Sequence, residues 1–131
     1  MNLRLGVPKE PENETRVGIV PSSMKKLLKA GFEVLVEKGA GVSANYSDAD
    51  YEAAGAKIVS RVDALACENI VCINFPGIEG ISENTNLACV ADPFRNPEYV
   101  KQCISSNITL MSMDMIPRRL SRAQSLSLIH I

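Results

Sequence analysis

Two stretches of this 131-residue sequence carry side chains whose type and spacing could do chemistry. In the first, Arg16 follows Glu14 and Thr15 at the end of a polar loop. A guanidinium is a fixed cation that can bind a carboxylate or a phosphate through two parallel hydrogen bonds. The alternative interpretation is a solvated arginine paired with Glu10, Glu12 or Glu14. On the residues alone we favour the ion pair.

The second stretch, residues 114–124, follows the last expected strand and contains three arginines and one glutamine. Arginine suits the charge of a phosphate, and glutamine suits an amide or ribose edge. Folds with a parallel sheet bind their ligands beyond the carboxyl ends of the strands. The candidate binding residues are therefore Arg118, Arg119 and Gln124. A solvated, charged linker is the alternative.

Other motifs that carry chemistry are missing from the sequence. There is no G-x-G-x-x-G, no phosphate-binding G-x-x-x-x-G-K-[ST], no H-E-x-x-H and no G-x-S-x-G. Gly39 and Gly41 supply only the first two glycines of a nucleotide fingerprint, with Ala44 in the last position, so we interpret them as turn formers. The four cysteines lack C-x-x-C spacing, and the sequence has one histidine. We therefore expect reduced thiols and no metal site.

Composition narrows the class of protein. The 14 Lys and Arg residues and the 15 Asp and Glu residues give a formal charge of −1. This balance lacks the excess of positive charge that binding to nucleic acid or anionic lipid requires. An apolar share of 46% and a charged share of 22% are those of a globular domain. No apolar run approaches the roughly 18 residues that a membrane span needs. The first residues lack the apolar core of a signal peptide.

Short apolar runs alternate with short amphipathic segments along the chain. We expect helices from Ser22 to Gly31, from Ser47 to Gly55, across 62–67 and from Pro97 to Ser105. Strands are expected at 3–7, 32–36, 57–59, 69–74, 87–91 and 108–113. The run 69–74 is apolar on both faces and is predicted to be central. The alternation predicts an α/β fold with a Rossmann-like or flavodoxin-like, mostly parallel sheet and helices on both faces, truncated at its C-terminus.

The C-terminal residues have an unusual sequence. The hexapeptide LSLIHI at 126–131 is what a common transposon adapter of sequencing libraries encodes. We therefore expect a domain over 1–125 and an adapter-derived tail over 126–131. A natural apolar tail is the alternative. If the tail is adapter-derived, His130 is accidental, and no histidine-based catalysis can be proposed.

Many of these segments resemble the N-terminal domain shared by alanine dehydrogenase and the proton-pumping NAD(P) transhydrogenase. They are residues 4–10, 13–17, 31–34, 37–41, 46–51, 54–56, 113–118 and 121–125. The last two are similar specifically to the transhydrogenase alpha subunit. The resemblance covers about residues 3–125.

Individual positions separate the two branches of the family. Alanine dehydrogenases have an arginine at the position of Arg16, a lysine where Cys72 stands and a histidine near the position of Asp92. A cysteine offers no permanent cation to a 2-oxo acid, and Asp92 would repel its carboxylate. These differences favour the transhydrogenase branch. An alanine dehydrogenase fragment and a non-catalytic α/β binding module are the alternatives.

The resemblance also implies a cofactor site. In transhydrogenases, the corresponding loop resembles a clamp on bound NAD(H) made of an arginine, a glutamine five residues later and an aspartate three beyond. Arg119 and Gln124 are five residues apart, as the arginine and glutamine of the clamp are. Arg118 directly follows a proline, as the family's arginine does. Ser127 stands where the aspartate would be. Arg16 is the further binding candidate. No side chain is expected to be catalytic.

The resemblance implies hydride transfer from NADH to NADP⁺ coupled to proton translocation. NADP would bind on another domain or subunit. The expected partners are a second copy of the chain and a beta subunit, or NADP-binding and membrane domains. The expected place is the cytoplasmic face of the inner or plasma membrane, with this part itself soluble. Because the glycine-rich fingerprint of the family lies further along its chain, we expect this fragment alone to be inactive.

Overall fold

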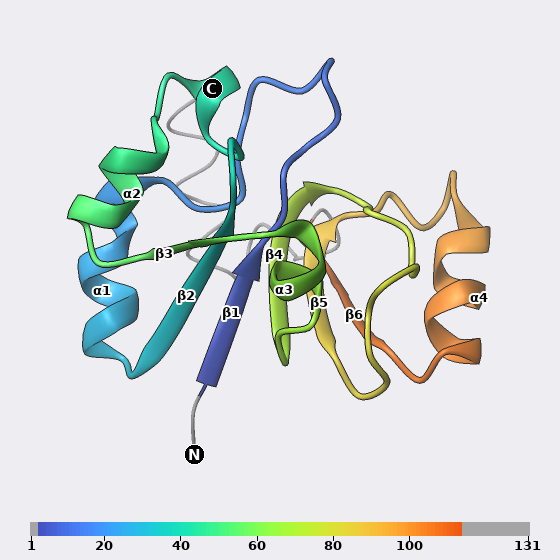
Figure 1. The fold of residues 1–131 in the computed structure, drawn as a ribbon. Helices are drawn as coiled ribbons and strands as arrows, with labels where there is room; N and C mark the ends of the chain where they lie inside the picture. Colours follow the sequence, from blue (N-terminus) through green and yellow to red (C-terminus); the bar gives the residue numbers. More distant parts are fainter. Residues whose placement is uncertain (1–2, 114–131) are drawn as a thin grey trace, which may run out of the picture.

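The fold is a six-stranded parallel sheet in the order β3-β2-β1-β4-β5-β6, seen in a computed structural model that describes residues 3–113 (Figure 1). The strands are β1 (Leu3–Val7), β2 (Phe32–Glu37), β3 (Lys57–Val59), β4 (Asn69–Asn74), β5 (Asn86–Val90) and β6 (Thr109–Ser112). Every neighbouring pair is parallel. The predicted α/β class is confirmed, and the strand order is the Rossmann-like one of the two that the sequence left open.

Four short helices join the strands within residues 3–113, and local sequence explains where they begin and end. They are α1 (Met24–Lys29), α2 (Asp48–Ala53), α3 (Arg61–Leu65) and α4 (Pro97–Ser105). The capping box that Ser47 and Asp50 predict is present at α2. Gly31 and Gly55 end helices with φ of +95° and +104°, values that favour glycine.

The predicted start of the first helix at Ser22 is wrong. Pro21–Ser23 form a 3-10 turn, α1 begins at Met24, and the hydroxyl of Ser23 makes no capping hydrogen bond. Proline has no N–H to donate, so it suits the first turn of a helix. Helical turning therefore begins at Pro21, one residue before the predicted start at Ser22, and it begins as a 3-10 turn.

The sheet separates two hydrophobic clusters. On one face, β1 and β2 pack against α1 and α2 through Leu5, Val7, Val34 and Val36, together with Met24 and the fully buried Tyr51. On the other face, β4 and β5 pack against α3 and α4 through Ile70, Cys72, Leu87 and Cys89, together with Leu65 and Cys103. Alternate residues of a strand point to opposite faces, which explains why both clusters draw on the same sheet. Helices therefore cover both faces, as predicted.

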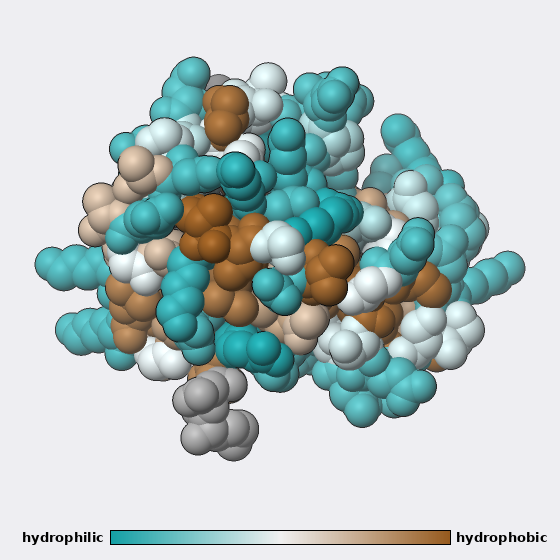
Figure 2. Space-filling model, viewed as in Figure 1, coloured by the Kyte–Doolittle hydropathy of each residue, from teal (hydrophilic) through white to brown (hydrophobic). Residues whose placement is uncertain are grey.

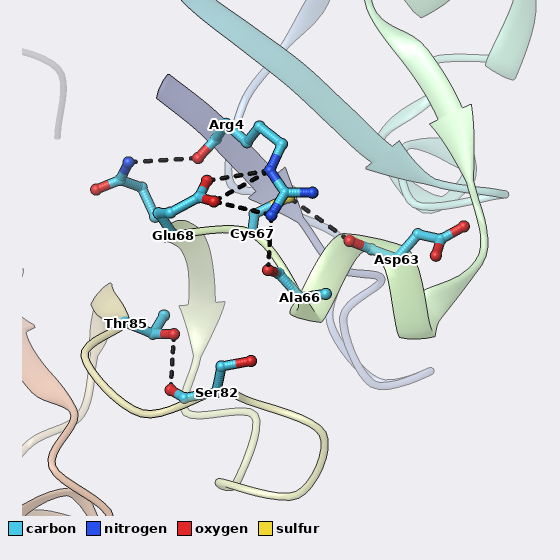
Figure 3. A network of polar contacts seen from close by, with 8 residues as sticks. Arg4, Asp63, Ala66, Cys67, Glu68, Ser82 and Thr85 are labelled. Atoms are coloured by element: carbon cyan, nitrogen blue, oxygen red, sulfur yellow. Dashed lines mark hydrogen bonds and ion pairs between the residues drawn. The ribbon is translucent and has the colours of Figure 1, made fainter. Parts of the chain in front are cut away.

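The predicted central strand is confirmed, because β4 lies between β1 and β5. At the amino ends of these strands, Arg4 makes a bidentate contact with Glu68, the shorter distance being 2.8 Å (Figure 3). The amide of Asn69 donates to the carbonyl of Arg4 at 3.3 Å, and Asn86 donates to Asn69 at 3.1 Å. This polar row joins β1, β4 and β5 at the edge opposite the expected site.

Hydrophobic side chains also reach the surface. Figure 2 shows them gathered across the middle of the view used in Figure 1, around the place of α3, with hydrophilic residues above and below. Val62 of α3 is 75% exposed. Within residues 3–113, none of the helices is long and apolar enough to cross a membrane.

Candidate functional site

The direction of the chain across the sheet reverses between β1 and β4. From β1 the chain moves outward through β2 to β3, and from β4 it moves the other way through β5 to β6. The loops that leave β1 and β4 at their carboxyl ends therefore diverge and leave a crevice, the usual ligand site of such sheets. A cleft of about 350 Å³ lies there. Its lining includes Lys9, Glu10, Glu37, Arg61, Cys72 and Asn74.

Glu10 is the buried anion of this cleft, with 8% of its surface exposed. Its carboxylate accepts hydrogen bonds from the main-chain amides of Ile73 at 2.8 Å and Asn74 at 2.9 Å. It also accepts one from the side-chain amide of Asn74 at 3.1 Å. These three donors offset the cost of taking the charge out of water. Glu10 therefore fixes the loop after β1 to the end of β4.

Arg16 forms the ion pair with Glu14 that the sequence favoured. Its guanidinium donates to the two carboxylate oxygens of Glu14, each at 3.0 Å, and its main-chain amide donates at 3.1 Å. Asn74 donates to the same carboxylate at 2.9 Å. The Arg16 contacts, with the help of Asn74, lower the pKa of Glu14 to about 2. The side chain of Arg16 stays 68% exposed, so the pair leaves its guanidinium accessible.

A second charged group closes the other side of the cleft. Arg61, the first residue of α3, donates to Glu37 at the end of β2 at 3.3 Å and to the carbonyl of Lys9 at 3.4 Å. The main-chain amide of Lys9 donates to Glu37 as well. These contacts join the carboxyl ends of β1 and β2 to the start of α3 and form one wall of the cleft.

The described side chains of the cleft suit binding and positioning rather than covalent chemistry. Cys72 is the one thiol that lines it, and Cys72 is buried. The hydrogen bond to Cys89 and burial raise its pKa, so it is a poor nucleophile. Among residues 3–113, no group of three or more His, Cys, Asp or Glu side chains could hold a metal ion.

The structure places some of the predicted residues and leaves others outside. Arg16 and Cys72 lie near the switch point, whereas Asp92 follows β5 and pairs with Arg95 at 3.6 Å. Arg118, Arg119, Gln124 and Ser127 lie outside the described residues, and so does the tail 126–131. The chain reaches their segment from the carboxyl end of β6, on the same edge of the sheet as the cleft.

Sequence reasoning missed Asn74 and the buried role of Glu10. Asn74 ends the central strand two residues before Pro76, a position at the ligand edge of the sheet that could have identified it. Glu10 gave no such signal, because a glutamate in a polar loop is usually solvated.

Comparisons with known proteins agree with this architecture. The sequence profile described as "Alanine dehydrogenase/PNT, N-terminal domain" matches residues 6–131. The chain is 36% identical over 126 residues to the NAD(P) transhydrogenase subunit alpha of Haemophilus influenzae, a match that covers 93% of this chain. The match covers 24% of that relative, so the chain spans about a quarter of its length.

Two solved structures are also similar. The transhydrogenase of Sinorhizobium meliloti superposes with a TM-score of 0.88 and 32% identity, covering 96% of this chain and 39% of that one. An L-alanine dehydrogenase superposes with a TM-score of 0.78 and 33% identity, covering 83% of this chain and 32% of that one.

Proposed function

This chain belongs to the family of alanine dehydrogenase/PNT N-terminal domains, and from that membership we propose that it is the N-terminal part of a transhydrogenase alpha subunit. The proposed activity of the whole protein is hydride transfer from NADH to NADP⁺ coupled to proton translocation. The proposed task of this part is to help bind and orient NAD(H). NADP would bind on another domain or subunit.

The observation that carries the proposal is the extent of the match. The likeness to transhydrogenase covers 96% of the chain with a TM-score of 0.88, against 83% and 0.78 for alanine dehydrogenase. The residues of the switch point agree with this choice. Cys72 and Asn74 put no cation on β4 itself that could bind the carboxylate of an amino acid, and the cations that line the cleft, Lys9 and Arg61, come from other elements.

Each proposed binding residue has a physical role. Arg118 and Arg119 would bind negative charge on the dinucleotide, and Gln124 would hydrogen-bond a ribose or amide edge. Arg16 keeps an exposed guanidinium and would add a further cation at the same edge. A bound nicotinamide supplies the hydride, so the protein has to position it and exclude water.

The proposal extends to the assembly. We expect a second copy of the chain and a beta subunit, or NADP-binding and membrane domains, as partners, in a complex at the cytoplasmic face of the inner or plasma membrane. We also propose that residues 126–131 are adapter-derived. Comparison of the source DNA with the adapter sequence tests that point directly.

The function is tested on the full-length protein recovered from the source DNA. We expect a strand–G-x-G-x-x-G–helix unit roughly 40–60 residues downstream. We also expect NADH-dependent reduction of an NADP⁺ analogue. Substitution Arg118→Ala should raise the KM for NADH about tenfold, whereas Arg95→Ala, an exposed arginine beside Asp92, should leave it unchanged. Reduction of NAD⁺ that depends on L-alanine would instead identify an alanine dehydrogenase.

A further inference from the structure

The carboxylate of Glu14 is saturated with hydrogen bonds. One of its oxygens accepts from the main-chain amide and from Nε of Arg16, at 3.1 and 3.0 Å. The other oxygen accepts from Nη2 of Arg16 at 3.0 Å and from the side-chain amide of Asn74 at 2.9 Å. A carboxylate offers about four acceptor positions, so these contacts use all of them. Glu14 therefore holds its neighbours in place and has no acceptor position left for a ligand.

The position of Glu14 is set from the central strand of the sheet. The side-chain nitrogen of Asn74 has two N–H groups and donates to both Glu14 and Glu10, at 2.9 and 3.1 Å. Glu10 in turn accepts from the main-chain amides of Ile73 and Asn74, so the backbone at the end of β4 fixes its place. A continuous row of hydrogen bonds thus leads from β4 through Glu10, Asn74 and Glu14 to Arg16.

The guanidinium of Arg16 keeps one binding edge open. Of the five N–H groups that a guanidinium carries, the contact with Glu14 uses one on Nε and one on Nη2. The edge formed by Nη1 and Nη2 makes no hydrogen bond within residues 3–113, and the side chain is 68% exposed. This edge has the fork geometry that binds two oxygens of a phosphate or a carboxylate side by side.

Arg4 and Glu68 form the same kind of pair at the opposite edge of the sheet, but there the fork is closed. Nε and Nη2 of Arg4 donate to Glu68 at 3.1 and 2.8 Å. Nη2 also donates to the carbonyl of Ala66 at 3.4 Å, which occupies the N–H group that Arg16 leaves open (Figure 3). The open fork is thus a property of Arg16 and does not follow from pairing with a glutamate.

We propose that Glu14 and Asn74 are positioning residues, which hold the guanidinium of Arg16 so that its open edge binds an anion with two adjacent oxygens. The inference rests on the proposed function for the identity of this anion, a phosphate group of NAD(H). An exposed arginine has many rotamers, and one that is already fixed loses less conformational entropy on binding. Glu14 therefore strengthens binding through geometry, whereas its negative charge alone would weaken the binding of an anion.

The test compares single and double substitutions in the full-length protein, with binding followed by NADH fluorescence. Arg16→Ala and Glu14→Ala should each raise the Kd for NADH about fivefold to tenfold, and Asn74→Ala should raise it about threefold. The double substitution should raise it no further than Arg16→Ala alone, because Glu14 acts through Arg16. Glu68→Ala, which removes the equivalent partner of Arg4, is the matched control and should leave the Kd unchanged.

Circular dichroism at the temperature of the titration shows whether each variant is folded. If Glu14→Ala does not fold, Glu14→Gln replaces it, and it should also raise the Kd. A lower Kd in the Glu14 variant would overturn the inference, because it would show that Glu14 only screens the charge of Arg16. Additive effects of the Glu14 and Arg16 substitutions would overturn it as well.

A second titration, with a carboxylate substrate, separates this inference from the proposed function. If the substitutions raise the KM for L-alanine and leave the Kd for NADH unchanged, the positioning of Arg16 is upheld and the proposed transhydrogenase function fails. If they change neither constant while NADH still reduces an NADP⁺ analogue, the proposed function stands and the positioning role is refuted.

Discussion

Asn74 at the end of β4 donates both its main-chain and its side-chain amide to one oxygen of Glu10, at 2.9 and 3.1 Å. The contact joins residues 64 positions apart in the sequence at the point where the direction of the sheet reverses. It joins the loop after β1 to the end of β4 beside the cleft. The proposed NAD(H) site needs such an edge, because the orientation of the reactants depends on it.

Glu10→Gln should destabilise the domain by about 1–3 kcal/mol. The new amide would replace one acceptor oxygen with a donor that faces the main-chain amide of either Ile73 or Asn74, and that buried donor would lose its partner. Urea unfolding followed by circular dichroism measures the change. Glu12→Gln, at an exposed position of the same loop, is the control and should change stability by less than about 0.5 kcal/mol. Equal effects of the two substitutions would contradict the role of Glu10.

The pair formed by Glu14 and Arg16 should make stability depend on pH. The pKa of Glu14 falls from 4.5 to about 2 in the folded chain, so its stabilisation is complete above pH 4.5 and is lost as the pH falls toward 2. Glu14→Gln should cost about 1 to 2 kcal/mol at pH 7, allowing for solvent screening at the exposed Arg16. The difference from the parent chain should disappear near pH 2.

Urea unfolding at a series of pH values measures this dependence. Glu83→Gln, at an exposed loop position, is the control and should show no such convergence. A stability difference between the parent chain and Glu14→Gln that stays constant from pH 7 to pH 2 would refute the assignment.

Gly6→Ala should destabilise the fold by about 3 kcal/mol. A Cβ at Gly6 would lie 2.0 Å from the carbonyl oxygen of Ala64, so β1 and α3 would have to move apart. Thermal unfolding measures the loss. Gly77→Ala is the comparison, since nothing lies within 4 Å of its added Cβ and only the φ of +82° opposes it. Its cost should be about 1 kcal/mol. A smaller effect at Gly6 than at Gly77 would show that α3 does not pack as described.

The thiols should be inert in the folded chain. Cys67, Cys72, Cys89 and Cys103 are buried, and burial raises the pKa of Cys67 to about 11. Ellman's reagent at pH 8 should therefore react with fewer than one thiol over the time in which guanidinium-unfolded chain reacts with all four. Rapid reaction of one thiol under native conditions would show that a cysteine is accessible after all.

Local pattern predicted most of the secondary structure. The strands at Leu3–Val7, Lys57–Val59 and Asn69–Asn74 have the predicted bounds, and so has the helix Pro97–Ser105. The capping box at Ser47 is local as well, since it needs contacts only within four residues. The start of α1 was misplaced because Pro21 and Ser22 both suit a helix N-terminus, and the sequence gives no means of choosing between them.

The sequence by itself determined the alternation of strands and helices and the family, because hydrophobic period and short motifs are local properties of a chain. It also restricted Arg16 to a few possible carboxylate partners. The tertiary structure decided which partner was right, and it placed Asn74 between Glu10 and Glu14. It also formed an apolar groove whose lining includes Val71, Ala88 and Met111, from three different strands. These features depend on strand order and register, which bring together residues more than 60 positions apart, and no local pattern encodes such distances.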